Sequence, residues 1–197
     1  RGGRYARAWR SARLRIGLCI VVVVTLAAVV GPWLLSYGPF EQGPDALQTP
    51  SGRHLLGTDE VGRDLLARVL AGTRVDLLIT LIAVPIAAVS GTLLGLSGLL
   101  QHHVGQLMQR LFDVLLGVPA VLLGVGVAIA VNPGKLSIVI AIVLVTAPIF
   151  GRQTGTAVAG QVALDYVTAA EVLGYSRARI TFRHVLPNIV DAIFVRI

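Results

Sequence analysis

Charged side chains are scarce in this chain of 197 residues: they make up 14% of it, where a soluble domain carries about a quarter. Cysteine is rarer still, since Cys19 stands alone, and this excludes a disulfide within the chain. The P-loop pattern of nucleotide-binding proteins, the HExxH pattern of zinc proteases and a Ser/His/Asp grouping are also missing. We therefore expect no catalytic residue, no metal site and no bound cofactor in the chain itself.

The chain contains four long runs of uncharged, mostly apolar residues. Residues 16–35, 77–100 and 114–134 hold 20, 24 and 21 residues without a charge, and residues 136–151 hold 16. About 20 helical residues cross a hydrocarbon layer ~30 Å thick. The runs therefore predict an all-α, polytopic membrane bundle with a single transmembrane domain. A fifth span starts at residues 186–197, which are too few to cross, and the chain lacks an initiating Met, so we interpret it as truncated.

Basic residues set the expected orientation. Residues 1–15 form a basic segment directly before the first span, residues 16–35, and the positive-inside rule places such a segment in the cytoplasm. A helix on anionic lipid and a disordered tail explain the segment equally well. Residues 36–76 then form an extracytoplasmic loop, residues 77–151 hold spans two to four, and residues 152–185 form a cytoplasmic loop. The N-terminal arginines are Arg1, Arg4, Arg7, Arg10, Arg13 and Arg15.

The extracytoplasmic loop contains the phrase "GTDEVGRD", at residues 57–64. We expect a short amphipathic helix from about Thr58, which is suited to an N-cap, with Asp59 and Glu60 in the first turn. Local ion pairs among these acids, Arg63 and Asp64 are the favoured interpretation. Contact with a protein outside the cell, or gating of the outer mouth, is the alternative.

A polar stretch, "DYVTAAEVLGYSRARITFRHVLPN", separates the fourth run from the fifth. Residues 165–173 favour a helix, and Gly174 is placed to end it. Ala169 and Ala170 give this helix a small-residue surface that another backbone or a groove can approach closely. A helix this short is unstable alone in water, so it must pack on a partner or on its own membrane domain. Pro187 suits the first turn of the following helix.

Two motifs carry a family resemblance. Ala169-Ala170, Gly174 and Leu186-Pro187 at these spacings resemble the "EAA" loop of permease subunits in bacterial ABC importers. "HLLGTDEVGRDLLARVLAGTRVDLL", at residues 54–78, resembles a hallmark of the dipeptide, oligopeptide and nickel importer permeases. Its hallmark residues are His54, Gly57, Thr58, Asp59, Gly62, Arg63 and Asp64.

The resemblance implies a type I importer fold and a mechanical role. In this family the loop forms a coupling helix that docks on a separate ATPase subunit. When two ATPase subunits close on ATP, the permease pair switches from the inward-facing to the outward-facing state. The implied partners are a homologous second permease, two ATPase subunits that carry ATP-Mg, an extracytoplasmic substrate-binding protein and the lipid bilayer of the inner membrane, with no nucleic acid. The implied cargo is a di- or oligopeptide. The docking residues would be Thr168, Ala169, Ala170, Glu171, Gly174, Leu186 and Pro187.

The sequence departs from the family at two points. Thr168 stands where the family usually has Glu, so either a charged contact to the ATPase is missing or Glu171, one turn later, supplies it. Asp191 falls inside the fifth span, where either Arg196, five residues later, partly shields it or it faces the interior of the bundle. A nickel-chelate importer permease remains an alternative within the family, and a membrane scaffold or sensor that does not transport remains one outside it.

The remaining polar and helix-breaking residues have ordinary explanations. The adjacent His102 and His103 point in different directions and lack a third ligand, so they predict no metal site. Arg110 and Asp113 are expected to mark the membrane interface at the inner end of span three. Kinks are expected at the prolines inside spans two, three and four, which are Pro85, Pro119 and Pro148.

Overall fold

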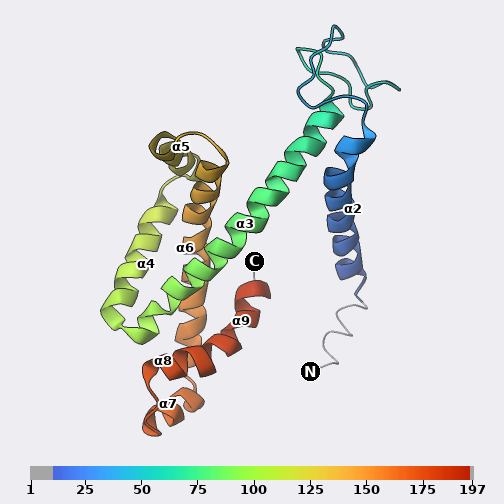
Figure 1. Ribbon diagram of the computed structural model, residues 1–197. Helices are drawn as coiled ribbons and strands as arrows, with labels where there is room; N and C mark the ends of the chain where they lie inside the picture. Colours follow the sequence, from blue (N-terminus) through green and yellow to red (C-terminus); the bar gives the residue numbers. More distant parts are fainter. Residues whose placement is uncertain (1–10, 196–197) are drawn as a thin grey trace. The chain divides into compact units, whose positions relative to one another are not determined.

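The computed structural model describes the backbone of residues 11–195 and the side chains of residues 11–190 (Figure 1). Helices are the regular elements of this part of the chain, joined by turns and one isolated β-bridge. The chain divides into two compact units, Arg1–Leu78 and Ile79–Ile197. The predictions for the arginines within residues 1–10 and for the side chains of Asp191 and Arg196 concern positions outside the described residues.

The first unit contains α2 (Ala12–Leu34), which carries the first apolar run. Ser11 caps α2, because its hydroxyl accepts a hydrogen bond from the Leu14 N–H (3.3 Å). Gly31 is buried, and its missing side chain leaves room for Leu70 of α3 to pack directly on the α2 backbone. The unit is completed by the loop that follows α2 and by the first residues of α3.

Helix α3 (Leu65–Leu100) is a single helix of 36 residues, about 54 Å long. The prediction of a separate short helix starting near Thr58 is wrong: α3 begins seven residues later and continues without a break through the apolar run. Thr58 is not its cap, because hydrogen bonds within the loop hold residues 58–64 out of helical conformation. Pro85 lies inside α3 and does not end it.

The third apolar run does not form one straight helix. Helix α4 (His102–Gly117) and helix α5 (Ala120–Val131) meet at an angle of 97°. Pro119 explains the break, because its ring excludes the helical conformation at Val118, which adopts an extended one. Gln101, in an extended conformation, separates α4 from the preceding α3.

Helix α6 (Lys135–Val162) contains Pro148 and extends eleven residues past Gly151. The first residues of the predicted cytoplasmic loop, which starts at residue 152, are therefore helical and continuous with the fourth apolar run. Hydropathy falls after Gly151, but small residues there keep the helix packed: a Cβ on Gly95 of α3 would lie 2.8 Å from the Thr154 Cβ. In Figure 1, α5 lies at one end of α6 and α7 at the other.

The chain after α6 forms α7 (Asp165–Val172), α8 (Arg177–Arg179), the π-helix η1 (Ile180–Val185) and α9 (Leu186–Val195). A core of buried residues joins α7, η1 and α9 to α6 and to the second part of α3. By length and composition, three of the described helices can cross a membrane, α2, α3 and α6, and the bent α4–α5 pair is a fourth candidate. The protein is thus an all-α, multi-pass membrane protein.

Candidate functional site

The helix predicted at residues 165–173 is present as α7, and it ends where expected. Gly174 adopts φ +75°, a left-handed conformation that glycine adopts without strain. Its N–H donates to the Glu171 carbonyl (2.9 Å), and the Tyr175 N–H donates to the Ala170 carbonyl (3.1 Å). This pair of bonds is the Schellman arrangement, which satisfies carbonyls that the helix end leaves free. The prediction that Gly174 terminates the helix is confirmed.

One face of α7 packs into the core of the second unit. Val167 and Ala170 are 2% and 5% exposed and belong to a cluster that includes Ile180 and Val185. The Tyr166 hydroxyl donates to Gln161 Oε1 on α6 (2.7 Å). Eight residues form a marginal helix in water, so these contacts are what hold α7 in place.

The opposite face of α7 is open. Thr168, Ala169 and Glu171 are exposed, and so are two adjacent apolar side chains: Val172 is 83% exposed and Leu173 is 71% exposed. The sequence reasoning missed this apolar pair because it took Ala169-Ala170 as one surface. Ala170 faces the chain's own core, so only part of the predicted docking set lies on the open face. The spacing of three between Val167 and Ala170 was the signal that could have shown this.

The segment after α7 folds back onto the helices. Ser176 caps α8 by accepting from the Arg179 N–H (3.4 Å), and the Arg179 guanidinium lies 5.2 Å from the centroid of the Tyr175 ring. Tyr175 in turn stacks on His184 of η1, with ring centroids 5.8 Å apart. Leu186-Pro187 follows η1 directly and begins α9, as predicted for this proline. The cytoplasmic loop of the prediction is therefore a folded element in which α7 and η1 share one core.

The hallmark residues of the first unit form a compact, hydrogen-bonded loop rather than a helix. Gly57 and Gly62 have φ of +79° and +72°, and a Cβ on Gly62 would collide with the Gly43 carbonyl. The Thr58 hydroxyl donates to the Asp45 carbonyl and accepts from the Gln48 N–H (2.9 Å). These glycines allow close backbone approaches that a side chain would prevent.

The Asp59 carboxylate holds the tip of this loop together through hydrogen bonds. Its carboxylate accepts from the Arg63 N–H (3.0 Å), the Val61 N–H (3.1 Å) and Arg63 Nε (2.7 Å). Desolvation by the loop raises the pKa of Asp59. The hydrogen bonds from Arg63 and Val61 and the positive charge of Arg63 lower it, and together they outweigh the desolvation. The pKa of Asp59 therefore lies below its ordinary value. The predicted Asp59–Arg63 ion pair is present, and Arg68 Nη1 approaches the same carboxylate (3.4 Å).

Asp64 has a partner that the sequence did not suggest. Its Oδ2 accepts from Nδ1 of His54 (2.9 Å), and both residues are buried, at 4% and 5% exposure. Its Oδ1 accepts from the Ala67 N–H (2.7 Å), which makes Asp64 the cap of α3. The Tyr37 ring lies over His54, with centroids 4.5 Å apart. One carboxylate thus joins the loop to the start of the helix.

We expect Asp64→Ala to open this loop. The change removes the cap of α3 and leaves the buried His54 nitrogen without its acceptor, at a cost of about 2–4 kcal/mol. Trypsin cleavage at Arg53 of the purified protein in detergent should accelerate at least tenfold. Glu60→Ala, at an exposed position of the same loop, is the control and should change nothing. Equal cleavage rates for the two variants would contradict the role of Asp64.

Long apolar helices packed around the folded segment of α7, α8 and η1 define a helical, multi-pass membrane protein. The family described as "Binding-protein-dependent transport system inner membrane component" matches residues 83–197, and the "N-terminal TM domain of oligopeptide transport permease C" matches residues 7–50. The first match covers more than half of the chain. The chain therefore belongs to the binding-protein-dependent transport system inner membrane components.

Several curated relatives share this similarity over most of the chain. The di/tripeptide transport system permease protein DppC of Pseudomonas aeruginosa is 40% identical over 188 residues, which cover 91% of this chain and 62% of the relative. The dipeptide permease DppC of Alkalihalophilus pseudofirmus is 36% identical, with 92% and 60% covered. The probable D,D-dipeptide permease DdpC of Escherichia coli is 35% identical, with 90% and 60% covered. The chain thus spans about three-fifths of the length of these relatives.

Proposed function

We propose that this chain forms half of the translocation pathway of an ATP-driven importer of di- and oligopeptides in the inner membrane, with its N-terminus in the cytoplasm. The observation that carries the proposal is the two-sided character of α7. One face is locked into the core through Val167 and Ala170, while Val172 and Leu173 present apolar surface at the other. This pair lies outside the long apolar runs, so its exposed surface is available to bind another protein. The names of the relatives support peptides as the cargo.

The packing of α7 suggests how force would pass through the chain. An ATPase subunit that moves α7 would pull on Ile180 and Val185 of η1 and on Val158 of α6, because these residues share one buried cluster with the inner face of α7. Closely packed interiors transmit displacement rather than absorb it. In this proposal the nucleotide, ATP-Mg, belongs to two partner ATPases, a homologous permease supplies the other half of the pathway, and a substrate-binding protein delivers cargo outside.

The test is a double substitution on the open face of α7. We expect Val172→Asp with Leu173→Asp to reduce co-purification of the ATPase subunits with the full-length permease pair by at least tenfold, because a desolvated apolar contact is replaced by two charges. Both side chains are exposed, so the change should leave the fold intact, as judged by the elution profile of the detergent-purified protein.

The control is a second exposed apolar pair. Leu55 and Leu56 are 61% and 47% exposed in the loop of the first unit, and their double change to Asp should leave ATPase binding unaltered. Undiminished ATPase binding by the α7 variant would refute the docking assignment. Intact binding without uptake of labelled peptide by the unaltered complex would favour the scaffold alternative.

A further inference from the structure

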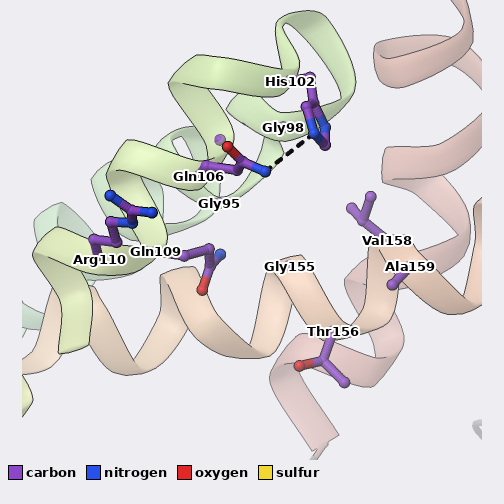
Figure 2. A pocket seen from close by; sticks show the side chains of 11 residues that line it. Gly95, Gly98, His102, Gln106, Gln109, Arg110, Gly155, Thr156, Val158 and Ala159 are labelled. Atoms are coloured by element: carbon purple, nitrogen blue, oxygen red, sulfur yellow. Dashed lines mark hydrogen bonds between the residues drawn. The ribbon is translucent and has the colours of Figure 1, made fainter.

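Helix α4 presents a polar face next to a cavity of about 650 Å³ in the second unit. Figure 2 shows Gln106 and Gln109 on α4, with Gly155 and Thr156 on the neighbouring α6. The rest of the lining is mostly small: Gly95 and Gly98 of α3 and Gly105 of α4 contribute no side chains. The volume lies within the usual range for small-molecule sites, which is about 300–1,000 Å³.

The charges around this cavity are not balanced. Arg110 lines it, and none of the eleven described lining residues is acidic. The nearest carboxylate along α4, Asp113, pairs with Arg152 of α6 (3.1 Å). Among the described residues, Arg110 itself forms no ion pair. Arg110 is exposed, so its guanidinium is accessible to an anion that enters the cavity.

Neutral hydrogen-bonding groups complete the lining. Gln106 donates to the His102 ring through its amide nitrogen (3.1 Å), which holds its carbonyl oxygen free, as Figure 2 shows. The Gln109 amide nitrogen lies over Gly155, where a Cβ would come within 2.6 Å of it. Thr156 is exposed beside them, with its hydroxyl donating to the Arg152 carbonyl (3.0 Å) and its lone pairs open. The cavity lining thus offers one cation, two side-chain amides and a hydroxyl. These groups are complementary to a ligand that carries a carboxylate next to an amide.

We propose that this cavity binds the C-terminal carboxylate of a peptide in transit, with Arg110 as the anchoring cation and Gln106, Gln109 and Thr156 as partners for the adjoining peptide group. The inference rests on the proposed importer function and specifies its substrate contact. A guanidinium binds a carboxylate through two parallel hydrogen bonds, which an ammonium cannot reproduce. A second cavity of about 380 Å³ shares Gly98, His102 and Val158 with the first and is lined by Glu171 and Arg177, so the occupant would lie close to the coupling segment.

The experiment compares two peptides in the complete importer, reconstituted in proteoliposomes with its binding protein and ATPases. Uptake of labelled dialanine is divided by uptake of dialanine amide, each at a concentration that saturates the binding protein. Arg110→Gln should lower this ratio about tenfold, because it removes a charge-assisted pair from the free acid only. Arg110→Lys should lose only two- to threefold, since the charge remains. The binding protein is the same in each case, so a change in the ratio reports on the permease.

Two controls make the result decisive. Arg74→Gln removes one exposed positive charge from the first unit and should leave the ratio unchanged. A photoreactive benzoylphenylalanine in place of Thr156 should cross-link labelled dialanine during turnover, and Arg110→Gln should reduce the adduct. An unchanged ratio in Arg110→Gln, or an equal loss of both peptides, overturns the carboxylate site while leaving the importer function standing. If the unaltered complex imports neither peptide, the importer proposal fails first and this inference fails with it.

Discussion

Gly95→Leu is expected to prevent the second unit from folding. A Cβ at this position would lie against the Gly151 carbonyl and 2.8 Å from the Thr154 Cβ, so a leucine there has to push α3 and α6 apart. Both contacts are with the body of a helix rather than with the end of a flexible side chain. Overpacking usually costs about 1–3 kcal/mol, and we expect Gly95→Ala to fall in that range and leucine to exceed it. Detergent-extracted, monodisperse protein should be nearly absent for the leucine variant.

The matched control lies on the same helix. Gly72 of α3 has nothing within 4 Å of the position a Cβ would take. Gly72→Ala should therefore raise the melting temperature slightly, because alanine favours a helix over glycine by about 0.5–1 kcal/mol. If the Gly72 and Gly95 alanine variants have the same melting temperature, the close approach of α3 to α6 is not what requires glycine at residue 95.

The second large effect concerns the end of α7. Gly174→Pro would force φ from +75° to about −65° and remove the N–H that donates to the Glu171 carbonyl, at a cost of about 3 kcal/mol or more. The Schellman turn would open, and α7 would lose its fixed position relative to η1. If α7 is the coupling helix, as we propose, transport-stimulated ATP hydrolysis by the reconstituted complex should fall by one to two orders of magnitude, measured as phosphate release.

Two further glycine substitutions distinguish the loss of the Schellman turn from a general loss of stability. Gly174→Ala should give an intermediate loss, since a left-handed conformation costs an L-residue about 1–2 kcal/mol. Gly160→Ala, at a helical position of α6 with open space around it, should hydrolyse ATP at the unaltered rate. Normal hydrolysis in Gly174→Pro, with protein yield preserved, would show that α7 does not transmit the signal.

Helix ends set by local chemistry were predicted well. Gly174 ends α7 as expected, and α9 begins at Leu186 before Pro187. Ends set by tertiary contact were not. The start of α3 was misplaced because Thr58 is engaged by Gln48 and Asp45, residues more than nine positions away that a local reading does not connect to it. The continuation of α6 beyond its apolar run was not anticipated either, and glycine-mediated packing against α3 accompanies it.

The candidate site follows the same division. The sequence placed a short helix at residues 165–173 and identified the phrase around Asp59 and Arg63, and both are present as local features. It could not show that Ala170 faces inward while Val172 and Leu173 face outward, because that depends on which side of α7 meets Ile180 and Val185. The pairing of His54 with Asp64 depends in the same way on how the loop closes.

What the sequence alone determined is the class of the protein. Uncharged runs about as long as a bilayer is thick predict membrane-spanning helices. Hydrocarbon offers no hydrogen-bond partners to the backbone, and a helix pairs its N–H and C=O groups within the segment itself. Only the tertiary structure decided which side chains of α7 remain exposed and that Arg110 borders a cavity whose described lining residues include no carboxylate. Burial and pairing are properties of surfaces that meet across distant parts of the chain, and composition along the chain does not specify which surfaces meet.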